Sequence, residues 1–131
     1  VGLFDEDLVS GGDLEFGKRV ADSGFDQAFI DSITVYHPSR SSLSELAKKY
    51  RRIGRGHAQI EVKHPEIASD RHFLDPRNFM PGTPFNFTEI FEETSEIKLR
   101  KKDIPAFYLI YYFLKLNRSL SKAINAMRQK A

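Results

Sequence analysis

The pattern of apolar and polar residues over residues 42–60 predicts a long helix. Its apolar face is formed by Leu43, Leu46, Ala47, Tyr50 and Ile53. These positions recur at helical spacing, with polar residues between them. Residues 42–45 read Ser-Leu-Ser-Glu, a capping box that favours a helix start. Gly54 and Gly56 weaken the helix by up to about 1 kcal/mol each relative to alanine, so they mark a kink or a close approach of another backbone.

A second long helix is predicted at the C-terminal end of the chain. Residues 104–114 are apolar or aromatic without interruption, and an apolar stripe then continues between basic residues to about residue 129. Asp103 can cap this helix, and Pro105 fits its first turn. The uninterrupted run of eleven residues is well short of the roughly 20 that a bilayer span requires.

Shorter elements are predicted nearer the N-terminus. Residues 13–23 form a short helix with Asp13 as its N-cap and Gly24 at its C-terminal end. Residues 28–30 and 33–36 are rich in β-branched and aromatic side chains, which predicts one or two short strands that stop before a proline.

The chain therefore divides into three parts, residues 1–60, 61–103 and 104–131. The middle part is an irregular, proline-containing connector, with a short polar helix over about residues 88–102. The fold of the chain is expected to be mainly α with one or two short strands.

Charge is distributed unevenly along the chain. Residues 1–36 carry eight acidic side chains against two basic ones, whereas the remainder carries eighteen basic side chains against ten acidic ones. Two interpretations remain open: the acidic and basic regions bind different partners, or they are two faces of one domain that attract each other. Cysteine is absent, which excludes disulfides, thiolate metal sites and cysteine nucleophiles.

Three motifs follow one another in the first forty residues: GLFDE at residues 2–6, SGGDLEFG at residues 10–17 and VYHP at residues 35–38. In this order and spacing they resemble the closing half of the catalytic domain of a family 2 glycosyltransferase. The resemblance covers roughly residues 1–60. The chain begins within the first motif, so we expect it to be the C-terminal part of a longer enzyme.

The resemblance implies a parent enzyme of α/β GT-A fold that transfers a sugar from a nucleotide-sugar donor to a hydroxyl of a saccharide or lipid-linked acceptor. It also implies that the transfer inverts the configuration at the anomeric carbon. Asp13 occupies the place of the aspartate that acts as general base in the family. Gly11 and Gly12 are expected to let the acceptor approach the backbone. Gly12 stands where many relatives have a second acid, which leaves the base in place but removes an acceptor-binding carboxylate.

The resemblance also places His37 at the position of a ligand to a divalent cation, Mn²⁺ or Mg²⁺, in the full-length enzyme. The Asp-x-Asp motif that would complete that metal site is not in this chain. Arg52 and Arg55 are expected to contact the diphosphate leaving group. The alternative for His37 is a structural role at the strand end, and the alternative for the arginines is a solvated helix face.

The terminal helix leaves two alternatives open. An aromatic-rich, basic amphipathic helix fits the surface of a membrane, as for a cytoplasmic enzyme of cell-envelope polysaccharide synthesis that attaches peripherally. It fits equally well against protein, either the rest of the catalytic domain or a second copy of the chain.

We expect the chain alone to be inactive and to form a homo-oligomer. The rival to an enzyme is a non-catalytic membrane- or protein-interaction module; no nucleic acid is expected as a partner, because the contiguous aromatics point around the whole helix.

Overall fold

The computed structural model describes residues 1–68, 72–81 and 100–130. The regular structure of these residues is helical and consists of α1 (Gly12–Asp22), α2 (Leu43–Lys63), two 3₁₀ turns, η1 (Pro65–Ile67) and η2 (Pro76–Asn78), and α4 (Ile104–Lys130). The expected mainly α character is confirmed. The predicted polar helix over residues 88–102 lies almost entirely outside the described residues.

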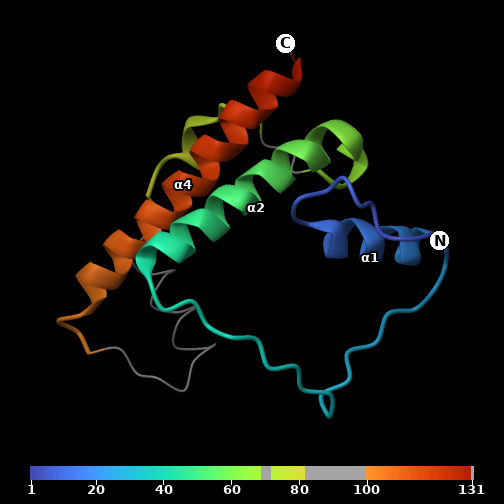
Figure 1. Cartoon of the computed structure of the whole chain (residues 1–131), viewed down its shortest axis with the longest axis horizontal. Helices are drawn as coiled ribbons and strands as arrows, with labels where there is room; N and C mark the ends of the chain where they lie inside the picture. The colour runs from blue at the N-terminus through green and yellow to red at the C-terminus, as the bar shows by residue number, and fades with distance from the viewer. Residues whose placement is uncertain (69–71, 82–99, 131) are drawn as a thin grey trace.

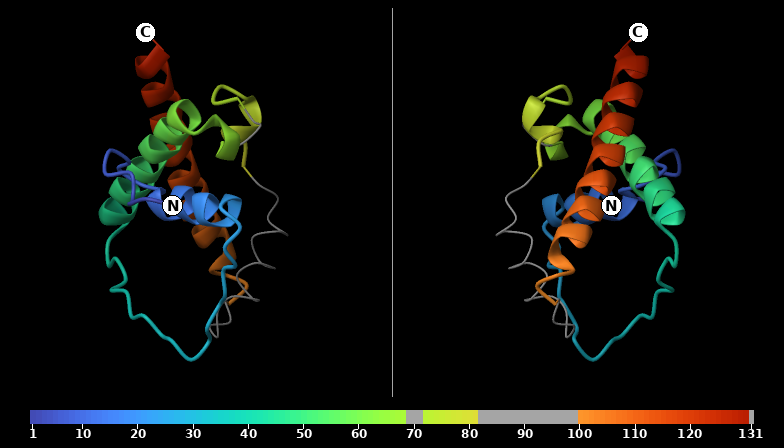
Figure 2. Two further views of the ribbon diagram at one scale, coloured as in Figure 1. Left: turned by 90° about the vertical axis from the view of Figure 1, so that its right-hand side faces the viewer. Right: turned by 90° about the vertical axis from the view of Figure 1, so that its left-hand side faces the viewer.

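The centre of the molecule is the crossing of α2 and α4 (Figures 1 and 2). A Cβ atom at Gly54 would overlap the carbonyl oxygen of Arg118 and lie 3.0 Å from the Lys122 nitrogen. The hydroxyl of Ser121 donates a hydrogen bond of 2.7 Å to the Arg51 carbonyl. Gly54 therefore marks a close approach between helices, one of the two alternatives that the sequence left open.

Small side chains fill the space beside this crossing. Ala58 of α2 is completely buried, and Ala123 and Ala126 of α4 are almost completely buried. Phe73, from the segment between the helices, joins them in one core cluster, and Phe79 packs against it. Because the helices meet through alanine and glycine, their backbones come close enough for one aromatic side chain to cover the junction.

The described part of the connector lies along α4. The Tyr112 hydroxyl donates to the Phe79 carbonyl over 2.9 Å, and the Ser119 hydroxyl donates to the Asn78 carbonyl over 2.7 Å. Leu114 is buried, whereas Leu109 and Phe113 remain exposed. The terminal helix is thus packed against its own chain in part, and part of its apolar run still faces outward.

The boundaries of α1 correct one prediction. Its N-cap is Gly11, with φ +88°, and the helix begins at Gly12. Asp13 is therefore a first-turn residue and not the cap. At the other end Gly24 adopts φ +79°, and its amide donates to the Ala21 carbonyl over 3.0 Å, so the prediction that glycine ends this helix is confirmed.

The start of α2 is as expected. Ser42 is the N-cap, and its hydroxyl accepts a hydrogen bond of 3.2 Å from the Glu45 amide. The helix continues to Lys63, one turn beyond the predicted end near residue 60.

The one or two short strands predicted from the sequence are absent from the described residues. Residues 28–30 and 33–36 belong to an irregular segment that loops away from the helices (Figure 1). The side chain of Phe29 is 95% exposed and that of Tyr36 is 92% exposed. A β-strand requires a partner strand for its backbone hydrogen bonds, and the described residues contain no strand to pair with. The prediction of strands was wrong for this reason.

Candidate functional site

Asp13 lies in the first turn of α1, where its carboxylate is exposed to solvent. Among the described residues, none forms an ion pair or hydrogen bond with this carboxylate. Asp13 is thus an accessible carboxylate in the first turn of a helix, and its role as a base stays a prediction.

The two preceding glycines differ in their surroundings. A Cβ atom at Gly11 would lie 2.6 Å from Cδ1 of Ile60, and its positive φ also disfavours a side chain. At Gly12 a Cβ atom would meet only an ordinary contact, 3.8 Å from a ring carbon of Phe4. Gly11 is therefore required for docking of the loop on α2, whereas the space at Gly12 allows a side chain. The predicted acceptor-binding role of both glycines stays a prediction.

The loop before α1 is held on α2 by polar contacts. The Val9 amide donates to the Gln59 side chain over 2.9 Å, and the same side chain donates to the Asp7 carbonyl over 2.8 Å. Lys63 forms an ion pair of 2.8 Å with Asp7. The acidic N-terminal region and the basic α2 therefore attract each other directly, which is the second of the two interpretations of the uneven charge.

Asp5 takes part in the same contacts. Partial burial opposes its ionisation, but hydrogen bonds from the Asp7 amide, His64 and Lys63 outweigh this effect and lower the pKa of Asp5. Its carboxylate therefore remains charged and ties the N-terminal loop to the end of α2.

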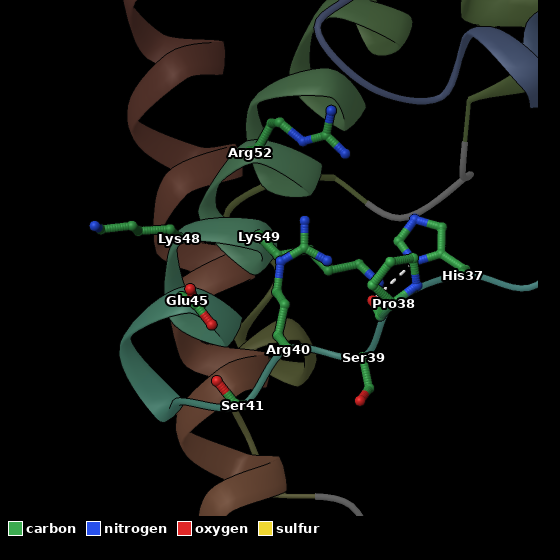
Figure 3. Close-up of a pocket in the computed structure, with 9 residues that line it drawn as sticks. All are labelled: His37, Pro38, Ser39, Arg40, Ser41, Glu45, Lys48, Lys49 and Arg52. Atoms are coloured by element: carbon green, nitrogen blue, oxygen red, sulfur yellow. Dashed lines mark hydrogen bonds between the residues drawn. The ribbon is translucent and has the colours of Figure 1, made fainter.

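An open cationic groove lies between residues 37–41 and the first half of α2 (Figure 3). It encloses about 580 Å³. We call it the basic groove; its lining residues with ionisable side chains are His37, Arg40, Glu45, Lys48, Lys49 and Arg52. Four positively charged side chains and one carboxylate thus line the groove, and this excess of positive charge favours an anion.

The basic groove contains two residues that were expected in different roles, and it leaves out one residue that was expected to act with them. His37 and Arg52, expected in different roles, line the same groove, whereas Arg55 is exposed on α2 and does not line it. Asp13 does not line it either. A guanidinium nitrogen of Arg52 also lies 3.4 Å from the Val9 carbonyl, which links the groove to the loop before α1.

The described residues alone do not form a metal site. Nowhere in residues 1–68, 72–81 and 100–130 do three or more His, Cys, Asp or Glu side chains gather in a way that could hold a metal ion. Mn²⁺ and Mg²⁺ prefer several oxygen ligands, and the groove beside His37 offers one carboxylate among four cations. The residues present therefore do not fit a divalent cation, and the role of His37 as a metal ligand stays a prediction.

One polar cluster was not anticipated from the sequence. Glu61 and Lys122 form an ion pair of 3.0 Å between α2 and α4, with side chains that are 16% and 15% exposed. His57, one turn before Glu61, lines the same small cavity. Burial, reinforced by Arg118 and Lys122, lowers the pKa of His57. The sequence signal that could have found this cluster is the helical period, because Glu61 lies one turn after the small apolar residue Ala58.

Comparison with known proteins finds a similarity to a glycosyltransferase. The chain is 40% identical over 60 residues to "Glycosyltransferase AglE" of Haloferax volcanii, an alignment that covers 46% of this chain and 19% of that protein. The chain therefore spans about a fifth of the length of the relative it matches. No protein-family model matches the chain, and no solved structure matches it. The similarity supports a glycosyltransferase-related region in this chain.

Proposed function

We propose that this chain is the acceptor-side, C-terminal part of an inverting glycosyltransferase of family 2 with a GT-A catalytic domain. The observation that carries the proposal is the position of Asp13, exposed in the first turn of α1 directly after two glycines. The similarity over 60 residues supports the coarser part of the proposal, a glycosyltransferase-related region. The donor is a nucleotide-sugar, and the acceptor is a hydroxyl of a saccharide or a lipid-linked saccharide.

The chemistry assigned to Asp13 is proton removal. The acceptor oxygen forms a bond to the anomeric carbon while the bond from that carbon to the nucleoside diphosphate breaks. The hydroxyl proton passes to the Asp13 carboxylate, so that no high-energy oxonium accumulates. The nucleoside diphosphate leaves with the bonding electron pair, and Arg52 and Arg55 are the side chains expected to stabilise its charge.

A divalent cation in the full-length enzyme would neutralise part of that charge. The described residues do not form a site for it, so we assign no step of the reaction to a metal ion. What this chain supplies is the base, the glycines beside it and cationic side chains.

The proposal is tested with Asp13→Asn in a longer protein that contains this chain, using release of nucleoside diphosphate from a nucleotide-sugar as the readout. Turnover should fall at least about a hundredfold, the lower end of what general base catalysis contributes, while donor binding stays nearly unchanged. Asp22→Asn is the matched control, because Asp22 is an exposed aspartate in the same helix that pairs with Lys18; this variant should keep its activity. Near-normal turnover of Asp13→Asn would remove Asp13 as the base.

A second candidate function is a non-catalytic module that binds a membrane or a protein. It is favoured by the exposed apolar side chains in the first half of α4, among them Leu109 and Phe113, which follow the basic residues 100–102. Among the described residues, no helix combines the length and apolar character needed to cross a bilayer. Sedimentation of the chain with anionic vesicles, together with wild-type activity of Asp13→Asn, would favour this candidate over the enzyme.

A further inference from the structure

We propose that the outer side of α4 is an interface at which two copies of this chain pair, with their α4 helices antiparallel. The interface is an apolar stripe along the helix, formed by Leu109, Phe113, Leu116, Leu120, Ile124 and Met127. These positions are three or four residues apart, so their side chains leave the same side of the helix. The proposal is argued from this stripe and does not depend on the proposed function.

The stripe lies away from the side on which α4 packs against α2. Ala123 and Ala126 are almost completely buried on the packed side, whereas Leu109 is 65% exposed and Met127 is 48% exposed. In the right-hand view of Figure 2, α4 passes in front of α2. Among the described residues, none buries the stripe, so a large part of its apolar surface is available to a partner.

The distribution of charge on α4 favours a protein partner over a membrane surface. The Nζ of Lys115 donates a hydrogen bond of 2.6 Å to a carbonyl of the connector, and Lys122 pairs with Glu61 over 3.0 Å. Both cations are engaged within the chain, whereas a helix on an anionic membrane uses such cations to bind headgroups. Asn117 and Ser121, which flank the stripe, are uncharged, so two copies can approach without repulsion.

The stripe is complementary to itself in an antiparallel pair. Leu109 and Met127 lie nine residues on either side of Arg118. Leu116 and Leu120 lie two residues on either side of the same point. A two-fold axis at this level places Leu116 of one copy beside Leu120 of the other, and Leu109 beside Met127. Apolar side chains therefore meet apolar side chains along the whole stripe.

A hollow beside the stripe favours the antiparallel direction over the parallel one. It encloses about 220 Å³ and is lined from both helices by Arg51, Asn117, Leu120, Ser121, Ile124 and Asn125. In the antiparallel pair, Phe113 lies at the level of residue 123 of the other copy, where its ring can enter this hollow. In a parallel pair, each Phe113 would face its own equivalent and the two hollows would face each other unfilled.

The exposed area of the stripe determines how tightly the copies should bind. Five of its side chains are about half exposed and together present on the order of 500 Å² per copy, at the upper end of the apolar patches that monomers expose. A standard interface buries roughly 800 Å² per partner. We therefore expect a dimer that dissociates at micromolar concentration.

The experiment is sedimentation equilibrium of the 131-residue chain across the micromolar range. A dimer of twice the 15.1 kDa mass of the chain is expected. Leu120→Glu should raise the dissociation constant at least about a hundredfold, because each dimer would bury two unpaired carboxylates. Val62→Glu is the matched control, because Val62 is 47% exposed on α2 outside the stripe; its dissociation constant should change less than about twofold. Circular dichroism establishes that each variant keeps its helices.

Cysteine cross-linking tests the direction of pairing, because the chain has no cysteine of its own. A disulfide requires Cα atoms within about 7 Å of each other. Under mild oxidation, a mixture of Leu109→Cys and Met127→Cys chains should form disulfide-linked dimers, whereas neither variant should do so alone. Cross-linking of Leu109→Cys alone would mean parallel pairing and would overturn the proposed arrangement.

Three other results would overturn the proposal. One is a monomer throughout the micromolar range. Another is a monomer that sediments with vesicles of phosphatidylserine and phosphatidylcholine and loses this binding in Leu120→Glu, which would make the stripe a lipid-binding surface. The third is an equal loss of dimer in Val62→Glu and Leu120→Glu. None of these results depends on transferase activity, and Asp13→Asn should dimerise like the parent chain, so a failure of the interface and a failure of the proposed function are distinguishable.

Discussion

The crossing of α2 with α4 and the segment of residues 25–42 are both rich in apolar residues, yet only at the crossing are these residues buried. At the crossing, Ala58, Ala123 and Ala126 are buried. In the segment, Phe29, Val35 and Tyr36 are among the most exposed side chains of the chain. Hydrophobicity alone therefore does not decide which part of this sequence is buried.

The difference follows from where each element obtains its backbone hydrogen bonds. A helix satisfies its amides and carbonyls within the segment, so α2 and α4 need only a complementary face, and glycine and alanine provide it. A strand obtains its hydrogen bonds from a neighbouring strand, and no strand is present in the described residues. The backbone hydrogen bonds of the crossing helices are satisfied within each helix, whereas residues 28–36 have no strand to pair with among the described residues.

The largest expected effect is at the point of closest approach. Gly54→Ala should destabilise the chain by about 3 kcal/mol, because the added Cβ would overlap the backbone of Arg118 in α4, which cannot move aside as a side chain could. Gly17→Ala in α1 is the control; its Cβ would lie 3.3 Å from the end of the flexible Gln27 side chain, and stability should not fall, because alanine favours a helix interior by up to about 1 kcal/mol over glycine. Urea unfolding followed by circular dichroism measures both. A Gly54→Ala variant as stable as the parent would show that the two helices do not touch there.

A smaller effect is expected from the ion pair beside the crossing. Lys122→Met should cost about 1–2 kcal/mol, because it leaves the largely buried Glu61 carboxylate without its partner. Lys18→Met removes an exposed pair with Asp22 and should cost less than about 0.5 kcal/mol. Equal unfolding midpoints for the two variants would contradict the assignment of Glu61 and Lys122 to the interior.

The smallest effect concerns pH. Burial, with Arg118 and Lys122, lowers the pKa of His57 below its ordinary value of 6.5. The unfolded chain therefore binds a proton at a pH where the folded chain does not, and stability should fall as the pH drops below about 6.5. Hydrogen bonding to Arg19 lowers the pKa of Glu15 below its ordinary value of 4.5. The stability that the ionised Glu15 contributes is therefore lost only as the pH falls below about 4.5.

Urea unfolding between about pH 7.5 and about pH 5.5 isolates the histidine contribution. His57→Gln should flatten the dependence of unfolding free energy on pH in this window. The same slope in the variant and the parent would show that His57 titrates as freely in the folded chain as in the unfolded one.

The sequence predicted the helices well because their signals are local. The capping serine Ser42, the glycine end of α1 and the period of the apolar residues all act within a few residues of each other. The strands over residues 28–36 were predicted from residue type alone, and residue type cannot provide the partner strand. The N-cap of α1 was predicted two positions too late, because Gly11, in the left-handed conformation, caps the helix in place of Asp13.

The candidate site was predicted less completely. Motifs pointed to Asp13, His37 and Arg52, but the sequence could not show that His37 and Arg52 share a groove with Arg40 and that Arg55 lies outside it. That information depends on how residues 37–41 cross the face of α2. The pairing of Glu61 with Lys122 likewise joins residues far apart in the sequence, and no local pattern encodes it.

Amide hydrogen exchange tests the central contrast most directly, when it is measured on the chain alone at low micromolar concentration and on a longer protein that contains it. In the chain alone, amides of α2 and α4 near the crossing should exchange slowly, and those of residues 28–36 should exchange at the rate of an unstructured peptide. In the longer protein, residues 28–36 should become protected while α2 and α4 change little. Protection of residues 28–36 in the chain alone, or their free exchange in both proteins, would contradict the account.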